Sequence, residues 1–248
     1  MKYNLSFDTA DLTFVTTASN SYINFVEPFI TFCKESNPCC KIEIWVDNPN
    51  KVSFDITDVK IHQLPDNYNV ATYRYIAEPT FDTKYTYITD IDIMHTEFVQ
   101  PFHLWHMNST DLPFSNVRRD DKGRTDRMSG LHFVKTSEWY TATKQTRKNI
   151  EPTGQDEQML LEIASSLFDI NAISSGLANR PVHGIHCSTE GKPRDPYAKL
   201  GWEITSQKVA YFKNVILKHG VFNEYFKTKV CIPLLGKKFI DKMNKHEI

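Results

Sequence analysis

The sequence lacks any long hydrophobic run. No stretch of its 248 residues approaches the roughly 20 consecutive apolar residues that a helix needs to cross a bilayer. The first residues, 1–6, also lack the apolar segment of a secretory signal peptide. We therefore expect a soluble, cytoplasmic protein.

Cysteine is scarce, and its spacing does not suit a metal cluster. There are five cysteines, of which Cys39 and Cys40 are adjacent, and no pair has Cys-X-X-Cys spacing. We expect free thiols in a reducing compartment, with no need of disulfides.

The sequence also has no excess of charge of either sign. The 29 lysines and arginines nearly balance the 30 acidic residues, which gives a net charge of -1. A protein whose main partner is a polyanion is normally clearly basic, so we expect no nucleic-acid partner. No Gly-rich basic loop follows the first predicted strand, which argues against a nucleotidyltransferase that grips a triphosphate.

A chain of this length suits one large α/β domain. Residues 12–17 form a β-rich run, and apolar residues then recur at helical spacing from 22 to 33, where Pro28 indicates a kink or a late start. Residues 41–46 alternate as a second strand, and 60–64 predict a weaker third. A helix around residues 73–79 and a strand at 85–94 follow. This order is typical of a nucleotide-binding half with a mostly parallel sheet, whose ligands gather at the carboxyl ends of the strands.

The most informative segment is 85–94, a strand-like run that ends in two carboxylates one residue apart, Asp90 and Asp92. Side chains at i and i+2 of a strand point to the same face, so these carboxylates project together and must be neutralised. The pattern predicts a divalent-cation site. A solvated turn at a strand end is the alternative.

The second half carries three further segments of interest. Residues 115–127 are polar and dense in charge, which fits either a solvated loop or a mobile segment beside a substrate. Gly130 leads into a β-rich strand. Asp156 and Glu157 stand in the first turn of a predicted helix, either as dipole-favoured capping groups or as site residues. That helix should bury three apolar side chains, Met159, Leu160 and Ile163.

These segments together resemble the GT-A glycosyltransferases, most closely family 8, the glycogenin-like and lipopolysaccharide galactosyltransferase-like enzymes. The family order is an Arg-bearing helix, a variable loop, a hydrophobic strand ending in Asp-X-Asp and a short return segment. Here residues 73–79 carry Arg74, the carboxylate strand follows, and 98–102 return. Thr89 departs from the pattern, because those families often have another small or apolar residue there.

The resemblance continues downstream, where the family has a histidine, a glycine and then Lys-Pro. His186 and the pair Lys192-Pro193 fall in register with it, and His183 is the local competitor for the histidine. The position of the glycine differs from the family pattern. Here Gly191 stands directly before the lysine, and Ser188 occupies the position where the family usually has glycine. This puts the backbone contact to diphosphate in doubt.

The resemblance implies a GT-A (Rossmann-like) α/β fold with a mixed, mostly parallel sheet flanked by helices. It implies Mn²⁺, or Mg²⁺, held by Asp90, Asp92 and His186, with Lys192 at the donor phosphates. Asp156 and Glu157 would position the sugar and the acceptor hydroxyl. The donor site that we expect consists of Thr16, Thr17, Ala18, Ser19, Tyr22, Arg74, Asp90, Ile91, Gly130, Gly191 and Lys192.

The implied activity is transfer of a sugar from a nucleotide sugar, expected to be a UDP-sugar, with retention of anomeric configuration. The acceptor hydroxyl could belong to a glycan, a lipid-linked sugar or a protein. A nucleotidyltransferase and a non-catalytic nucleotide- or carbohydrate-binding protein remain the alternatives. Four intact residues, Asp90, Asp92, His186 and Lys192, argue against the latter.

We expect residues 1–248 to form one glycosyltransferase domain. Its parts would be a nucleotide-sugar-binding half (1–112), an acceptor and metal-completing half (113–215) and a C-terminal helical cap (216–248). Residues 225–239 mix basic and apolar side chains. They could pack as the cap or rest peripherally on an anionic membrane.

Overall fold

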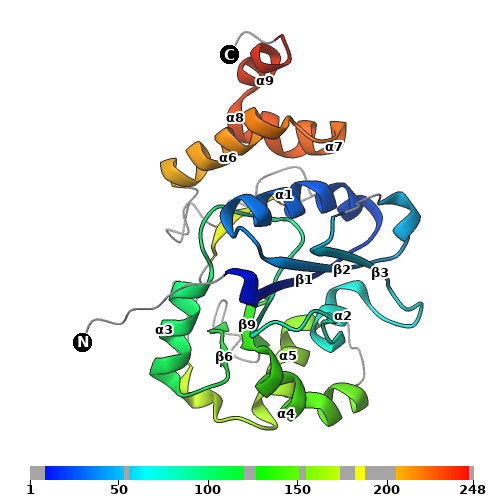
Figure 1. Cartoon of the computed structure of the whole chain (residues 1–248). Helices are drawn as coiled ribbons and strands as arrows, with labels where there is room; N and C mark the ends of the chain where they lie inside the picture. Colours follow the sequence, from blue (N-terminus) through cyan, green and yellow to red (C-terminus); the bar gives the residue numbers. More distant parts are fainter. Residues whose placement is uncertain are drawn as a thin grey trace.

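The computed structural model describes residues 9–52, 56–119, 127–150, 155–173, 182–187 and 205–245 (Figure 1). A six-stranded sheet with the order β3–β2–β1–β4–β9–β6 forms its centre. The strands are β1 (Leu12–Ala18), β2 (Lys41–Val46), β3 (Val59–Gln63), β4 (Tyr85–Ile88), β6 (Phe114–Ser115) and β9 (His132–Lys135). The first four are parallel, and β9 is antiparallel to both β4 and β6. The expected mixed, mostly parallel sheet is therefore confirmed.

The predicted strands and the first helix lie where the sequence placed them. A 3-10 segment, η2 (Asn20–Phe25), precedes α1 (Val26–Ser36). The helix thus starts late, and Pro28 falls in its first turn, where a missing N–H costs no helical hydrogen bond. Short 3-10 turns occur at η1 (Thr9–Asp11), η3 (Pro49–Lys51) and η5 (Ile170–Ala172).

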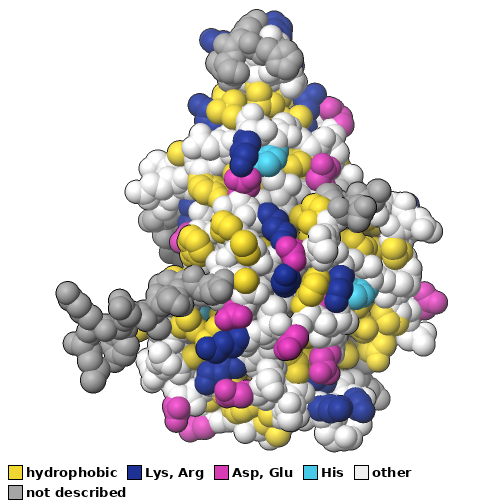
Figure 2. All heavy atoms as spheres, in the orientation of Figure 1, with side chains coloured by type: hydrophobic (Ala, Val, Ile, Leu, Met, Phe, Trp, Pro, Cys, Tyr) yellow, Lys and Arg dark blue, Asp and Glu magenta, His cyan; other side chains and the backbone are white. Residues whose placement is uncertain are grey.

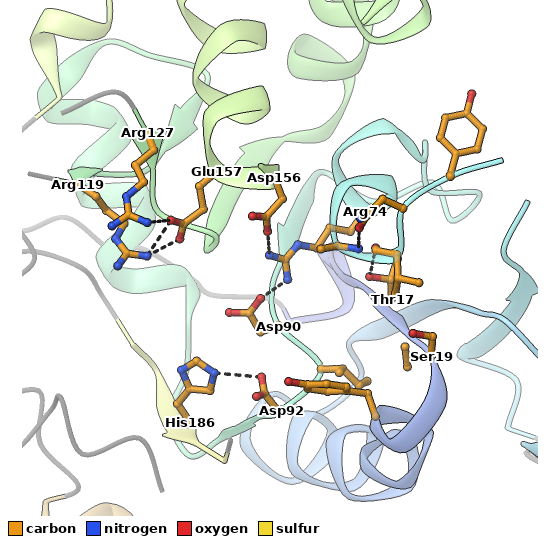
Figure 3. Close-up of a pocket in the computed structure, with 17 residues that line it drawn as sticks. Thr17, Ser19, Arg74, Asp90, Asp92, Arg119, Arg127, Asp156, Glu157 and His186 are labelled. Carbon is orange, nitrogen blue, oxygen red and sulfur yellow. Dashed lines mark hydrogen bonds and ion pairs between the residues drawn. The ribbon is translucent and has the colours of Figure 1, made fainter. Parts of the chain in front are cut away.

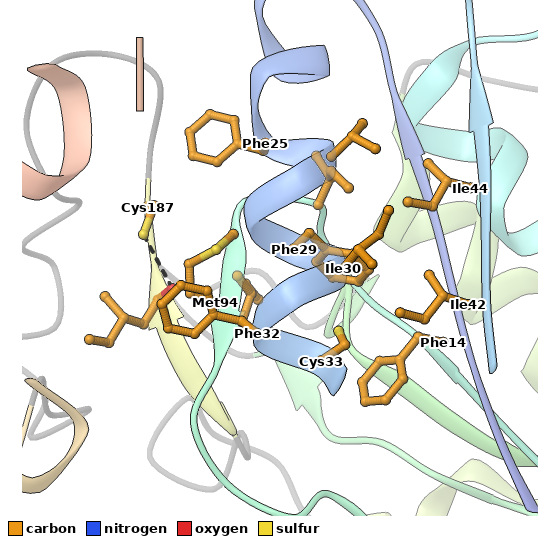
Figure 4. Close-up of a cluster of buried hydrophobic side chains, with 14 of the residues drawn as sticks. Phe14, Phe25, Phe29, Ile30, Phe32, Cys33, Ile42, Ile44, Met94 and Cys187 are labelled. Atoms are coloured by element: carbon orange, nitrogen blue, oxygen red, sulfur yellow. Dashed lines mark hydrogen bonds between the residues drawn. The ribbon is translucent and has the colours of Figure 1, made fainter. Parts of the chain in front are cut away.

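Helices cover both faces of the sheet. Because side chains alternate along a strand, Phe14 packs on the α1 side and Val15 on the opposite side. Figure 4 shows Phe29 and Phe32 of α1 in the first of these cores. Each such side chain contributes about 1.5–3 kcal/mol when it is fully buried. The opposite core lies under α2 (Val70–Ile76), α4 (Thr136–Asn149) and α5 (Asp156–Ser165).

The predicted α5 core residues are confirmed as buried: Met159, Leu160 and Ile163. Arg74 lies in the last turn of α2. Asp90 and Asp92 come directly after β4, as the strand pattern predicted.

A helical unit of residues 205–245 packs on the outer side of α1 (Figure 1). Its elements are α6 (Ser206–His219), α7 (Glu224–Phe226), the π turn η7 (Lys227–Cys231), α8 (Ile232–Leu235) and α9 (Lys237–Asn244). Phe212 meets Phe32 with ring centroids 4.8 Å apart, and Phe226 meets Phe25 at 5.8 Å. None of the helices in the described part of the chain is long and apolar enough to span a bilayer.

Two antiparallel ribbons complete the architecture. β5 (Ile93–His95) begins directly after Asp92 and pairs with β10 (Gly184–His186), while β7 (Arg118–Arg119) pairs with β8 (Arg127–Met128). Helix α3 (Gln100–Thr110) follows β5.

Five buried histidines connect these ribbons with the sheet: His95, His103, His106, His132 and His183. His183 Nε2 lies 3.1 Å from His103 Nε2, and the Ser115 hydroxyl lies 2.8 Å from Nδ1 of both His103 and His106. Burial lowers the pKa of every one, to about 3 for His95 and His132 and to about 4 for His183. All five are therefore neutral at neutral pH.

This histidine set predicts a stability that decreases in mild acid. Below the ordinary histidine pKa of 6.5 the unfolded chain binds protons that the folded chain refuses. The free energy of unfolding should therefore have its highest value above pH 6.5. Below that pH it should fall by about 1.4 kcal/mol per pH unit for each such histidine. Urea unfolding at several pH values measures the slope. His132→Phe should lower the slope by about the equivalent of one proton, because the unfolded chain then has one histidine fewer to protonate. The control Phe114→Leu changes a buried side chain that does not titrate, so it should leave the slope unchanged. An equal change of slope in both variants would contradict the assignment.

Candidate functional site

A pocket of about 770 Å³ opens at the carboxyl ends of β1 and β4 (Figure 3). Its walls come from the end of β1 with η2, the start of α2, the turn after β4, the β7–β8 ribbon, the first turn of α5 and β10. The lining residues are Thr17, Ala18, Ser19, Tyr22, Tyr68, Asn69, Val70, Ala71, Arg74, Asp90, Ile91, Asp92, Arg119, Arg127, Asp156, Glu157 and His186. The pocket thus lies at the sheet edge where parallel α/β folds bind ligands.

Three potential metal ligands meet in this pocket. One ligand atom each of Asp90, Asp92 and His186 lies within 4.8 Å of the others. His186 Nε2 is 3.1 Å from Asp92 Oδ1, and these two side chains are only 8% and 7% exposed. Two carboxylates and an imidazole suit a divalent ion such as Mn²⁺ or Mg²⁺. These three side chains can therefore hold such an ion.

Backbone pairing brings the histidine to the carboxylates. His186 pairs with Ile93 in the β5–β10 ribbon, and the Cys187 N–H donates to the Asp92 carbonyl at 2.6 Å. Gly184 makes this approach possible, since a Cβ there would lie 2.2 Å from the carbonyl oxygen of Met94. The ribbon, rather than local sequence, therefore determines where His186 lies.

Arg74 joins the Asp90 side of the pocket to α5. Its guanidinium donates through Nη1 to Asp90 and through Nη2 to Asp156 Oδ2 at 2.8 Å. Burial lowers the pKa of Arg74, but Asp90, Tyr75 and Asp156 outweigh this and leave the pKa well above its ordinary value. The charge is thus permanent, and it partly neutralises two of the pocket carboxylates.

Glu157 is held separately by the β7–β8 ribbon. Arg119 Nη1 contacts both its carboxylate oxygens, at 2.6 and 2.8 Å, and Arg127 Nη1 lies 3.3 Å from Oε2. The Gly130 N–H donates to Oε1 at 3.1 Å. The carboxylate is therefore fixed in one orientation at the pocket wall.

The opposite wall of the pocket is polar and aromatic. Thr17 at the end of β1 donates through Oγ1 to the Val70 carbonyl at 2.7 Å, which ties this strand to the start of α2. Asn69 caps α2 by accepting from the Ala71 N–H at 2.9 Å. In Figure 3, Thr17 and Ser19 lie on the other side of Asp90 from Arg119 and Arg127.

Most of the residues that the sequence nominated lie on this pocket. Those on it are Thr17, Ala18, Ser19, Tyr22, Arg74, Asp90, Ile91, Asp92, Asp156, Glu157 and His186. Thr16 is fully buried and is not among the lining residues. Gly130 lies behind the wall, where an added Cβ would be 3.1 Å from Arg74 Nη2, so its missing side chain makes room for the guanidinium. His183 belongs to the histidine set instead, and Gly191 and Lys192 fall outside the described residues.

Sequence reasoning missed the wall formed by Tyr68, Asn69, Val70 and Ala71. Asn69 before an apolar run is a helix N-cap signal, which could have located the start of α2 but not its position beside β1. Arg119 and Arg127 belong to the charge-dense segment 115–127. Only the ribbon reveals that both contact Glu157.

The chain matches no protein-family model and no curated protein. Three of the solved structures to which the chain is weakly similar are these. The glycosyltransferase GlyE of Streptococcus pneumoniae TIGR4 has a TM-score of 0.43 at 14% identity, over 67% of this chain but only 44% of GlyE. An active-site mutant of LgtC has a TM-score of 0.39 at 14% identity, over 60% of this chain and 68% of LgtC. 4-Diphosphocytidyl-2C-methyl-D-erythritol synthase from Anaerococcus prevotii DSM 20548 has a TM-score of 0.44 at 10% identity, over 77% of this chain and 98% of the synthase. The fold and the site therefore rest on the strand order and geometry described above.

Gly184→Ala should weaken metal binding without touching a ligand. The new Cβ would clash with backbone atoms of Met94 and His95, so β10 must shift and carry His186 away from Asp92. We expect a loss of about 1–3 kcal/mol in unfolding free energy and at least a tenfold weaker Mn²⁺ affinity, measured by calorimetric titration. Gly220→Ala is the control, because its φ of +89° strains the backbone far from any ligand. Equal Mn²⁺ affinity in both variants would contradict this role of the ribbon.

Proposed function

We propose that this protein is a metal-dependent GT-A-type glycosyltransferase, acting on a nucleotide sugar and a hydroxyl acceptor. The observation that carries the proposal is the convergence of Asp90, Asp92 and His186 on a pocket of about 770 Å³. That volume lies within the range of pockets for molecules of nucleotide-sugar size. The order of motifs along the chain supports the same family.

Asp90, Asp92 and His186 would hold Mn²⁺ or Mg²⁺, which when bound supplies Lewis-acid stabilisation of the charge that develops on a leaving diphosphate. Arg74 keeps the Asp90 carboxylate oriented through its direct ion pair. Lys192 would add a positive charge at the diphosphate, as its place in the family register implies. The site would thus act chiefly by electrostatic stabilisation, without a protein nucleophile.

Asp156 and Glu157 would position the sugar and the acceptor. Arg74 holds the Asp156 carboxylate, and Arg119 and Arg127 hold that of Glu157, so the oxygens of both have fixed positions from which to accept hydrogen bonds from sugar hydroxyls. In the retaining reaction that we propose, the acceptor oxygen bonds to the anomeric carbon on the face from which the diphosphate departs. The acceptor proton passes to the leaving phosphate oxygen, so no separate protein base is needed.

The nucleoside would occupy the wall between Thr17, Ser19, Tyr22 and the start of α2. This wall offers hydroxyls, an amide and aromatic rings from β1, η2 and α2. A uracil base, and hence a UDP-sugar, follows from the family resemblance. The acceptor in this proposal is a hydroxyl of a glycan, a lipid-linked sugar or a protein.

Asp90→Asn and Asp92→Asn should each abolish Mn²⁺-dependent donor turnover while leaving the fold intact. Loss of one of few ligands should cost about 3 kcal/mol, on the order of a hundredfold in rate. The measurement is UDP release from a panel of UDP-sugars with Mn²⁺ and with EDTA. Asp82→Asn, an exposed carboxylate outside the pocket, is the control. Near-normal, EDTA-insensitive turnover in both variants would refute the metal role. Pyrophosphate release from a nucleoside triphosphate would instead favour a nucleotidyltransferase.

The two neighbouring histidines should behave differently on substitution. His186→Ala removes a ligand, so Mn²⁺ affinity should fall at least tenfold with little change in melting temperature. His183→Ala leaves His103 Nε2 unpartnered in the core, so unfolding free energy should fall by about 1–3 kcal/mol while Mn²⁺ affinity persists. The reverse pattern would make His183 the ligand and would displace Lys192 from the phosphates.

A further inference from the structure

Positive charge is concentrated in the C-terminal helical unit. Residues 205–245 contain nine lysines, no arginine and two acidic residues, Glu224 and Asp241. Their net charge is therefore +7, whereas the entire chain carries -1. The unit also projects from the side of the molecule beyond α1 (Figure 1). A charge separation of this size creates a local field that the composition of the whole chain conceals.

Helix α9 sorts its lysines onto one side. Lys238, Lys242 and Lys245 follow each other at spacings of four and three, so they lie along one face, and all three are exposed. Ile240 on the opposite face is fully buried. With the exposed Lys237 at the start of the helix, these residues form what we term the α9 lysine face: Lys237, Lys238, Lys242 and Lys245. Exposed Asp241 lies on the same side of the helix, so the face carries four lysines and one acidic residue.

Apolar surface borders the α9 lysine face. Phe239 is only partly buried, and Lys213 of α6 lies over its ring with Nζ 4.6 Å from the centroid. Leu234 and Leu235 of α8 are also half-buried. Figure 2 shows hydrophobic and basic side chains side by side around these helices, at the top of the view. Lysine stems beside half-exposed apolar groups match the boundary between lipid headgroups and acyl chains.

We propose that the α9 lysine face docks the protein on an anionic phospholipid bilayer. The lysines meet the negative headgroups, and the neighbouring apolar groups rest at their level. The basic residues of 205–245, histidine aside, are all lysines, and Lys213 lies over the ring of Phe239. Nucleic-acid surfaces ordinarily add arginine forks and open aromatic faces, so a bilayer is the better match. The interaction does not depend on the transferase activity.

Co-sedimentation of the full chain with vesicles tests this proposal. We expect binding to phosphatidylcholine vesicles with about 30% phosphatidylserine, little binding to pure phosphatidylcholine, and loss of binding near 0.5 M NaCl, about where screening shortens to a few ångström. The triple variant K238Q/K242Q/K245Q should lower the partition coefficient about a hundredfold, since each lysine near an anionic surface contributes about 1 kcal/mol. The matched control, K51Q/K144Q/K148Q, removes three exposed lysines elsewhere and should bind as the parent protein does.

Melting temperatures of both triple variants should equal that of the parent protein, because the substituted side chains are exposed. Equal losses in the two triple variants would overturn the assignment to α9. Absence of binding to anionic vesicles at low salt would overturn the proposal itself. Tighter binding to double-stranded DNA than to the anionic vesicles would also overturn it, in favour of a nucleic-acid partner.

Discussion

The buried guanidinium of Arg74 is the interaction on which the pocket depends. It lies between Asp90, after β4, and Asp156, at the start of α5, and so joins three elements that are distant in sequence. Without it, two carboxylates would lose their shared partner in a partly desolvated site, where removing one partner of a buried pair typically costs about 3–5 kcal/mol. Gly130 is part of the same arrangement, because the space of its missing side chain lies next to the guanidinium.

The charges of the pocket are also compatible with a bound cation. Among the residues that the structure describes, four carboxylates line it, and the three lining guanidiniums contact Asp90, Asp156 and Glu157. Asp92 instead faces the imidazole of His186. A divalent ion at this point would neutralise the carboxylate pair in the turn after β4 and would add the positive charge that a diphosphate needs. Ion pairing and the proposed chemistry therefore make the same demand on the site.

Rigid backbone pairing supports both sides of this arrangement. On one side the β5–β10 ribbon carries His186, with Gly184 packed against β5 and His183 anchored to His103 in the core. On the other, the β7–β8 ribbon presents the arginines that hold Glu157. Side chains that paired strands hold in place lose little conformational entropy when a metal ion or substrate binds to them. The basic helical unit lies beyond α1, where we propose that it contacts an anionic bilayer.

Local pattern was enough to place the first four strands and the Asp-X-Asp turn, because alternation depends on near neighbours in the chain. At Pro28 it left a kink or a late start of α1 open, and the structure shows the late start. The family resemblance, rather than local pattern, nominated Arg74 and His186. Tertiary packing decided which of the nominated residues meet: that Arg74 bridges Asp90 to Asp156, that Thr16 turns into the core, and that His186 faces Asp92 while His183 does not. These outcomes depend on strand pairing and helix packing between segments up to about 95 residues apart, a separation over which no local periodicity carries information.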